Sequence, residues 1–392
     1  MKLKYILPLA ALLSLNSLAA NISTKAKYAL LIDADTNQVI YEKNSKAKMA
    51  PSSMSKLMTV YIAFQKLKDG SLKLDDKVVV SKNAWSKGGS RMFLPLNEAV
   101  SVEDLLKGVI IQSGNDASTA LAEHIAGSEE AFIARMNTVA QQIGLNNSHF
   151  ANSTGWPDKN HYMTAEDLAK LTNAIVVDFP QYYHYFAEKE FTYNRIKQIN
   201  RNVLINKNIG VDGLKTGHTD SGGYGIAASA KQGDRRLVLV INGTATDSER
   251  AIEAQKLLQY GFLNFTNVKV AMANDAIASA KVFSGSISNV NLVCHQNLIF
   301  TVPVEHKNHI QAVANYDEKL RAPIAKNQKV GVVEVRIPNQ ELKTFDMCAK
   351  HDILEAGLMK KTYHKVKYWV QNLTFSSPKL DGAKASKELM IN

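Results

Sequence analysis

The sequence predicts an α/β fold: a mostly antiparallel β-sheet with helices on both faces and a helical subdomain, followed by a small all-β domain. Strand-like runs occur at both ends of the first 266 residues, and helical periodicity fills the stretch between them. After about Asn267 the texture changes to short β-branched runs separated by turn residues. A chain of 392 residues is also long for one ordinary core, which favours two domains.

The chain begins with a segment that does not belong to this fold. MKLKYILPLAALLSLNSLAAN combines two lysines, a short apolar run and small residues, which is the pattern of a secretory signal peptide. We expect residues 1–20 to be this signal, with cleavage after Ala19 or Ala20. An uncleaved N-terminal anchor is the alternative. No later stretch is apolar enough to predict a membrane-spanning helix.

Residues 21–266 are expected to form the first domain. YALLIDADTNQVIYEKN predicts a β-hairpin, because two β-rich runs flank the turn residues 35–37. Pro51 is favoured in a first helical turn, so a helix is expected from Pro51 to about Lys68. The helical subdomain is expected at about 83–170, where SVEDLLKGVI and GSEEAFIARMNTVAQQIGL begin with helix-capping patterns.

Strands return from residue 210 in GVDGLKTGHT, GYGIAASAKQ and DRRLVLVINGT, and the helical ERAIEAQKLLQYGF follows them. The β-rich C-terminal domain is expected at 267–351, from KVFSG, VNLVCHQNLIFTVPV, HIQAVANY and KVGVVEVRI. Its two cysteines, Cys294 and Cys348, could pair in an oxidising compartment or remain two buried free thiols. Both possibilities stay open at this point.

Residues 352–373, DILEAGLMKKTYHKVKYWVQNL, have apolar positions at helical spacing and lysines mostly on the other side. We expect an amphipathic helix that lies on a membrane surface, and packing on its own domain is the alternative. Residues 374–392 are expected to be a mobile polar tail. The formal charge of +11 fits an anionic membrane surface better than nucleic acid, because the export signal directs the chain away from the cytoplasm.

Three short motifs carry the chemistry. Ser-x-x-Lys occurs three times, but only Ser53 and Lys56 stand at a helix start that follows strands. Ser113-Gly114-Asn115 interrupts strongly helical flanks, and Lys215-Thr216-Gly217 lies once on a glycine-rich strand. Each motif alone is weak, because a helix cap is the safer interpretation of Ser53 taken by itself. Their common order and context indicate one catalytic site.

With these motifs the chain resembles the penicillin-binding serine acyl-transferases, whose motif set is Ser-x-x-Lys, Ser-x-Asn and Lys-Thr-Gly. Within them it is most similar to the low-molecular-mass D-alanyl-D-alanine carboxypeptidases, the S11-like serine DD-peptidases. PSSMSKLMT, IIQSGNDAS, EKEFTYNRIKQINRN and VDGLKTGHTDSGGYG carry this likeness. The resemblance implies a β-lactamase/transpeptidase-like first domain, a periplasmic location on the outer face of the inner membrane, and no metal or cofactor. It also implies peptidoglycan stem pentapeptides as substrate and β-lactam antibiotics as covalent inhibitors.

The residue chemistry agrees with this resemblance. A serine hydroxyl needs a base to become a nucleophile, and Lys56 lies one helical turn from Ser53. Burial and the second cation, Lys215, would lower the pKa of Lys56 and so favour its neutral form. Ser113 could pass a proton to the leaving amine, with Asn115 holding the substrate and the lysine.

A substrate that ends in a carboxylate needs cations and hydroxyls, and Lys215 and Thr216 are the near candidates. Gly217 allows the strand to approach a ligand closely. The resemblance adds the arginines Arg201 and Arg250, and it implies that the backbone N–H of His218 joins that of Ser53 in an oxyanion hole. Ser90 is expected to line the cleft.

The loop STGWPDKNHYM departs from the resemblance, since the bulky Trp156 and then Pro157 stand where the family has a small Gly-Leu-Asp pattern. This leaves the deacylation rate and the substrate preference open. No Glu-x-x-Leu-x-Asn pattern occurs there, so β-lactamase activity is not expected to be primary. Two alternatives to a carboxypeptidase are a DD-endopeptidase, a class that usually lacks the β domain, and a weakly active wall-binding scaffold.

Overall fold

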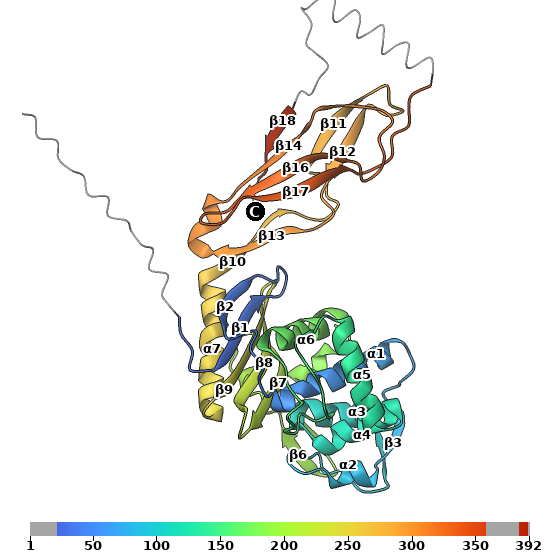
Figure 1. The fold of residues 1–392 in the computed structure, drawn as a ribbon, viewed down its shortest axis with the longest axis vertical. Helices are drawn as coiled ribbons and strands as arrows, with labels where there is room; N and C mark the ends of the chain where they lie inside the picture. The colour runs from blue at the N-terminus through green and yellow to red at the C-terminus, as the bar shows by residue number, and fades with distance from the viewer. Residues whose placement is uncertain (1–21, 358–383, 391–392) are drawn as a thin grey trace, which may run out of the picture.

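The structure is a computed structural model that describes residues 22–357 and 384–390. Figure 1 shows a mixed helix-and-sheet unit below and a β-sheet unit above, with helix α7 (Asp247–Asn264) running from one toward the other. The expected signal peptide and most of the expected amphipathic helix lie outside the described residues. No helix in the described part of the chain is long and apolar enough to cross a membrane.

The first unit is built on a five-stranded sheet in the order β2-β1-β9-β8-β7. Every neighbouring pair is antiparallel, which confirms the expected hairpin and the mostly antiparallel sheet. The strands are β1 (Tyr28–Asp33), β2 (Val39–Lys43), β7 (Val211–Thr219), β8 (Gly223–Gln232) and β9 (Arg235–Thr244).

Strand β9 explains why the sheet carries helices on both faces. Its side chains alternate in direction, so Val238 and Val240 join one core while Leu239 and Ile241 join the other. The first core packs against α1 and α6, and the second packs against α7. A strand buried on both faces reads as a continuous apolar run, which is what RRLVLVINGT contains.

Several helices between β2 and β7 begin at a capping side chain. Ser101, Ser128 and Thr164 each accept a hydrogen bond from the backbone N–H three residues ahead. The helical elements are α1 (Lys56–Lys68), α2 (Lys82–Ser86), α3 (Val102–Lys107), the π-helical turn η2 (Gly108–Gln112), α4 (Asn115–Ala126), α5 (Glu129–Gln142), α6 (Ala165–Asp178) and the 3₁₀ turns η3 (Tyr183–Ala187) and η4 (Val203–Asn206). Two small antiparallel sheets of two strands each complete this unit, β3 (Lys77–Val79) with β4 (Ala99–Ser101) and β5 (Glu190–Tyr193) with β6 (Ile196–Ile199).

The expected helix from Pro51 is wrong in its first turn. Residues Ser52–Ser55 form a 3₁₀ turn, η1, and the α-helix begins only at Lys56. Ser52 has a left-handed φ of 51°, and its hydroxyl lies 2.8 Å from the Thr219 hydroxyl at the end of β7. Contact with a distant strand therefore overrides the local preference for a regular helix start.

The second unit is all-β, as expected. Its seven-stranded sheet has the order β15-β11-β12-β17-β16-β14-β18, and β10 pairs with β13 beside it. The strands are β10 (Phe265–Ala271), β11 (Ala278–Phe283), β12 (Asn289–Val293), β13 (Leu298–Pro303), β14 (Gln311–Asp317), β15 (Lys319–Arg321), β16 (Lys329–Arg336), β17 (Lys343–Ala349) and β18 (Lys384–Glu388), with a 3₁₀ turn η5 (Val304–His309). Cys294 and Cys348 are both buried free thiols.

The polar tail is not mobile throughout, because Lys384–Glu388 form strand β18. This strand pairs antiparallel with β14 from Val313 to Asp317, and Ser386 also donates to the Asn315 side chain at 2.7 Å. Without it, β14 would be an edge strand with unpaired N–H and C=O groups. The pairing follows from that open edge, since KASKE has no strand-like pattern of its own.

The expected helix cannot begin at Asp352. Ile353 is buried and bridges to Ile324, and the Ala356 N–H donates to the Ser284 carbonyl. Residues 352–357 therefore lack helical structure and belong to the β unit, because the Ile353 side chain joins its core. The remainder of the expected helix lies outside the described residues.

We expect deletion of residues 384–392 to expose β14. The amides of β14 should then exchange with solvent at least about tenfold faster, because the strand loses its hydrogen-bonded neighbour. Hydrogen-exchange mass spectrometry measures this rate. Lys387→Met is the matched control, since it removes one side-chain bond to the Ile277 carbonyl and keeps the strand pairing. Unchanged exchange in the deletion variant would show that β18 does not protect this edge.

Candidate active site

Ser53 and Lys56 meet at the junction of the 3₁₀ turn and helix α1. The Lys56 Nζ lies 2.9 Å from the Ser53 Oγ. Ser53 is partly exposed, whereas Lys56 is completely buried. A hydroxyl that is open on one side and touches a buried amine on the other is the arrangement of a nucleophile with its base.

Two further oxygens surround the Lys56 amine. The Asn115 Oδ1 lies 2.6 Å from the Nζ, and the Thr154 carbonyl oxygen lies 2.5 Å from it. Burial lowers the pKa of Lys56 to about 7, helped by the positive charge of Arg201 and opposed by the negative charge of Asp116. At neutral pH roughly half of these amines are therefore neutral and able to accept a proton.

Ser113 lies at the end of a strained turn. It follows the π-helical turn η2 and has a left-handed φ of 69°, an uncommon conformation for a residue other than glycine. Asn115 then begins helix α4, with its backbone N–H donating to the Ser90 carbonyl and its side-chain NH₂ donating to the Gly88 carbonyl, both at 2.7 Å. The buried Asp116 carboxylate accepts from backbone N–H groups of the same 90–94 segment.

Strand β7 forms the opposite wall. Lys215 is buried, and its Nζ donates to the Thr216 carbonyl at 3.0 Å. Burial and the positive charges of Lys56, Arg201 and Arg250 hold the pKa of Lys215 well below its usual value.

The strand reaches the nucleophile turn closely only because residue 217 is glycine. A Cβ on Gly217 would lie 2.9 Å from the Pro51 carbonyl oxygen and 3.1 Å from the Met54 nitrogen. Gly155 brings the facing loop equally near, since its Cβ would overlap the Ser52 carbonyl. Two glycines therefore allow two separate segments to pack closely against the nucleophile turn.

The cleft between these walls has a volume of about 890 Å³. It brings together nine of the residues that the motifs and the resemblance selected: Ser53, Ser90, Ser113, Asn115, Arg201, Thr216, Gly217, His218 and Arg250. Lys56 and Lys215 lie buried behind its walls. The structure thus brings all eleven selected residues together, and two of the residues that line the cleft are arginines.

The comparisons with known proteins agree with this geometry. Residues 16–246 match the peptidase family described as D-alanyl-D-alanine carboxypeptidase, and residues 265–355 match the domain described as penicillin-binding protein 5, C-terminal domain. The chain belongs to the D-alanyl-D-alanine carboxypeptidase family. It is 37% identical to a carboxypeptidase (DacA) of Haemophilus influenzae over 86% of this chain and 88% of that protein. It is 38% identical to DacC of Escherichia coli over 87% of each.

Solved structures extend the likeness to three dimensions. Penicillin-binding protein 5 from Haemophilus influenzae matches with a TM-score of 0.79 over 85% of this chain and 99% of that one, at 37% identity. The ampicillin-bound penicillin-binding protein D2 from Listeria monocytogenes matches 62% of this chain and 99% of its own, at 26% identity and a TM-score of 0.57. The chain is therefore a serine-type carboxypeptidase, a hydrolase with a penicillin-binding fold.

Trp156, which the resemblance singled out, forms part of one wall of the cleft. The Trp156 side chain is 54% exposed and lines the cleft, and a Cβ on Gly89 would lie 2.8 Å from its indole ring. The indole thus lies across the cleft wall, against the backbone beside Ser90. On β7 and β8, the His218 and Tyr224 rings stack with centroids 3.8 Å apart.

Several site groups left no signal in the sequence. The Thr154 and Gly88 carbonyls are backbone acceptors, which no side-chain motif can mark. Tyr224 and Asp247 line the cleft without belonging to any of the three motifs. Asp247, at the start of α7, forms an ion pair with the buried Arg250 and could have been suspected only from its spacing of three residues.

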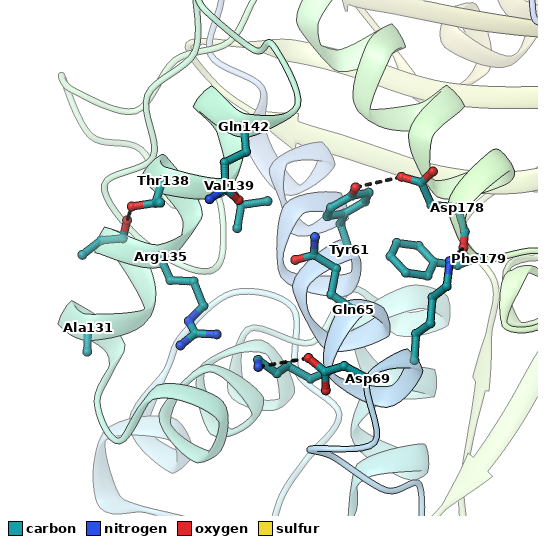
Figure 2. Close-up of a pocket in the computed structure, with 13 residues that line it drawn as sticks. Tyr61, Gln65, Asp69, Ala131, Arg135, Thr138, Val139, Gln142, Asp178 and Phe179 are labelled. Atoms are coloured by element: carbon teal, nitrogen blue, oxygen red, sulfur yellow. Dashed lines mark hydrogen bonds and ion pairs between the residues drawn. The ribbon is translucent and has the colours of Figure 1, made fainter.

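A second hollow of about 870 Å³ lies away from the cleft, between α1, α5 and the end of α6 (Figure 2). The Tyr61 hydroxyl donates to Asp178 there at 2.8 Å, and Lys66 pairs with Asp69 at 3.2 Å. Its lining residues include no serine, cysteine or histidine. The hollow therefore does not repeat the nucleophile and base of the catalytic cleft.

We expect Gly217→Ala to lower the rate of acylation by penicillin about 100-fold, because the new Cβ meets backbone atoms that cannot turn aside. Stopped-flow measurement with a fluorescent penicillin gives this rate. Gly357→Ala is the matched control, since its Cβ would meet no described atom within 4 Å. If Gly217→Ala acylates at the normal rate with an unchanged fold, close approach of β7 to the nucleophile turn is not required.

Proposed function

We propose that this carboxypeptidase removes the terminal D-alanine from peptidoglycan stem pentapeptides through an acyl-enzyme on Ser53. One observation carries the assignment: the Ser53 Oγ lies at the cleft, 2.9 Å from a buried amine whose pKa is about 7. The relatives named D-alanyl-D-alanine carboxypeptidase support the substrate class.

In the acylation step the Lys56 amine takes the Ser53 proton as the Oγ attacks the carbonyl carbon of the last peptide bond. The negative charge that develops on the carbonyl oxygen faces the backbone N–H groups of Ser53 and His218. Ser113 relays a proton to the departing D-alanine nitrogen, so the C–N bond breaks and an ester on Ser53 remains. Water then attacks this ester, with Lys56 as the base, and frees the serine.

The C-terminal carboxylate of the substrate class accounts for the positive charges that line the cleft. Thr216 and Arg250 are buried next to the cleft, and Arg201 lies at its edge. A terminal carboxylate seated among them would form charge-assisted hydrogen bonds. Lys215 lies buried behind the same wall, where its protonated form would add positive charge. A β-lactam carries a carboxylate at the corresponding place and would acylate the same serine.

We expect penicillin to form its adduct on the tryptic peptide that contains Ser53, as measured by mass spectrometry. Lys56→Ala should abolish the adduct, because no other base touches the Ser53 Oγ among the described contacts. In the wild-type protein the acylation rate should rise with pH and reach half its plateau near pH 7, since the lysine must be neutral to act.

Lys66→Ala is a suitable control, because its ammonium pairs with Asp69 in the second hollow, away from the cleft. An adduct on another residue would overturn the assignment of Ser53. Normal labelling of Lys56→Ala would show that another group activates the serine.

We further propose that the protein works at the outer face of the inner membrane, held there through residues 358–373. The sequence pattern of this segment supports the proposal, and so does the location of its flanks. On one flank, the Ala356 N–H donates to the Ser284 carbonyl in the turn between β11 and β12. On the other flank, Lys384 pairs with Asp317, and the carbonyl of the next residue, Glu318, accepts from the Lys281 N–H on β11. Both flanks of residues 358–383 thus lie at the same end of the β unit.

We expect replacement of residues 358–383 by a flexible Gly-Ser linker to release the protein from vesicles that contain anionic lipid. Activity on soluble D-Ala-D-Ala peptides should stay unchanged, because the linker joins two neighbouring flanks and leaves β18 in place. A variant with glutamine at Lys360, Lys361, Lys365 and Lys367 should lose mainly the salt-sensitive part of binding. Persistent membrane binding of the linker variant would assign attachment to another part of the chain.

A further inference from the structure

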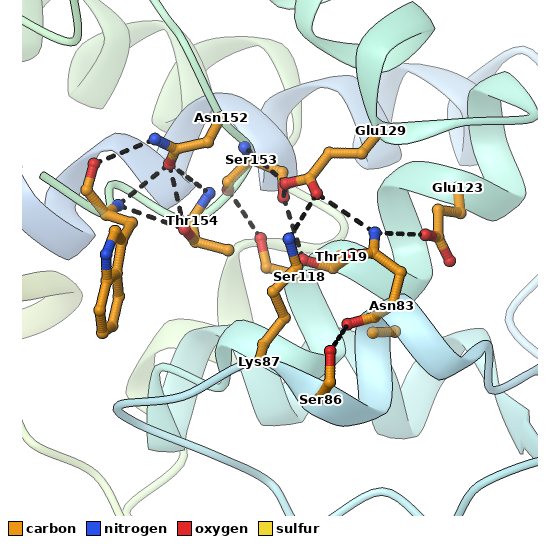
Figure 3. A network of polar contacts seen from close by, with 12 residues as sticks. Asn83, Ser86, Lys87, Ser118, Thr119, Glu123, Glu129, Asn152, Ser153 and Thr154 are labelled. Atoms are coloured by element: carbon orange, nitrogen blue, oxygen red, sulfur yellow. Dashed lines mark hydrogen bonds and ion pairs between the residues drawn. The ribbon is translucent and has the colours of Figure 1, made fainter. Parts of the chain in front are cut away.

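Glu129 is a buried carboxylate that lies behind the cleft and not in it. It is the first residue of α5, its exposed fraction is 7%, and it is absent from the residues that line the cleft. Figure 3 shows it between two segments that are far apart in the sequence, one carrying Ser153 and one carrying Lys87. These segments form facing parts of the catalytic site.

The two oxygens of this carboxylate serve different segments. Oε1 accepts from the Ser153 hydroxyl at 2.7 Å and from the Ser153 backbone N–H at 3.3 Å. Oε2 accepts from the Lys87 Nζ at 2.7 Å and from the Asn83 side chain at 3.4 Å. The Glu129 carboxylate therefore links the two segments to each other through hydrogen bonds.

Glu129 is ionised at neutral pH. Burial acts to raise its pKa, but the hydrogen bonds from Lys87 and Ser153 and the charge of Lys87 outweigh it and leave the pKa below the usual value. Its place in the first turn of α5 also favours a negative charge. The Glu129 carboxylate can thus hold Lys87 and Ser153 through charge-assisted hydrogen bonds.

The first segment ends at an acceptor of the catalytic amine. Ser153, which Glu129 holds through its side chain, turns its own carbonyl toward the Thr59 and Ser118 hydroxyls, at 2.9 Å and 2.8 Å. The next carbonyl, that of Thr154, lies 2.5 Å from the Lys56 Nζ. The place of this carbonyl therefore depends on how Ser153 is held.

The second segment reaches the same amine through an amide. Lys87 is followed by Gly88, whose carbonyl accepts from the Asn115 NH₂ at 2.7 Å. An amide with its nitrogen held in this way must turn its oxygen to the other side, where the Asn115 Oδ1 lies 2.6 Å from the Lys56 Nζ. The orientation of this amide thus depends on how Lys87 is held.

These two oxygens decide where the base points. A neutral lysine amine has two N–H bonds and one lone pair in a tetrahedral arrangement. If the two N–H bonds go to Thr154 and Asn115, the lone pair is left for the third neighbour, the Ser53 hydroxyl at 2.9 Å. A proton transfer needs this alignment, so both acceptors must be in place together.

We propose that Glu129, with Lys87, is a positioning residue for the general base: it holds the two acceptors that aim the Lys56 lone pair at Ser53. The role rests on the proposed function, in which Lys56 activates Ser53. Glu129 itself touches neither the nucleophile nor the cleft.

The test is the rate of acylation by a fluorescent penicillin, measured for Glu129→Gln between pH 5 and pH 9. The plateau rate should fall about tenfold or more, while the affinity of the initial non-covalent complex stays unchanged. The acid limb should move to lower pH, because the Lys56 ammonium loses the alignment of its two acceptors, the Thr154 carbonyl and the Asn115 Oδ1. Arg201 and Asp116, whose charges act on Lys56, remain in all variants, and so do Lys215 and His161, on which the charge of Lys56 acts.

Glu123→Gln is the matched control. Glu123 belongs to the same polar network (Figure 3), but it accepts from Ser81 at 2.6 Å and from Asn83 at 2.7 Å. This variant removes a neighbouring charge without touching Lys87 or Ser153, so it should keep the wild-type rate and acid limb.

The hydrogen bonds that join Glu129 to the Lys87 segment and to the Ser153 segment can also be removed one at a time. Lys87→Met and Ser153→Ala should each give a smaller loss than Glu129→Gln, and Glu129→Gln should cost less when Lys87→Met is already present. These two variants carry the test if Glu129→Gln does not fold.

Three outcomes decide between the proposals. If Glu129→Gln keeps the wild-type rate and acid limb, or if its acid limb stays while only its melting temperature falls, the positioning role is wrong. If Lys56→Ala still acylates, the proposed mechanism itself fails. Loss of acylation in Lys56→Ala together with wild-type behaviour in Glu129→Gln removes only the positioning role.

Discussion

The burial of two lysine amines in one site is the constraint that the catalytic unit is built around. Lys56 and Lys215 are both almost completely buried. Burial and nearby positive charges lower the pKa of each amine. Water entering the site would undo this effect, because it would stabilise the charged amines. The tight walls follow from this requirement: Gly155 and Gly217 bring their chains against the nucleophile turn at distances that no larger residue allows.

Much of the structure could be predicted because its causes are local. The helices that begin at Ser101, Ser128 and Thr164 carry their own caps, and the strands alternate or run apolar according to which faces are covered. The catalytic set could be found because its side chains form motifs of fixed spacing. The first turn at Ser52 could not, since its left-handed backbone depends on Thr219, far along the chain.

Strand β18 is a second element that could not be predicted from its own residues. Lys384–Glu388 are polar, and their pairing is decided by the open edge of β14 rather than by their own pattern. The Thr154 carbonyl is a further case, because any residue supplies a carbonyl and only the fold decides which one reaches Lys56. The role of Glu129 could not be predicted either, because a glutamate just after a serine cap is common at the start of any helix.

The direction of β18 has a practical consequence. The strand starts opposite Asp317 and runs antiparallel to β14, so Glu388 lies opposite Val313 and the Leu389 N–H bonds to the Ala312 carbonyl. Beyond that point lies η5, which contacts β10 and β13, the strands that follow α7. A fluorophore attached at residue 390 would therefore sit near the junction of the two units, where the Thr36 and Thr301 hydroxyls lie 2.6 Å apart. Such a probe would report on any change in the distance between the units, and a probe of lipid contact would have to be placed at the opposite end.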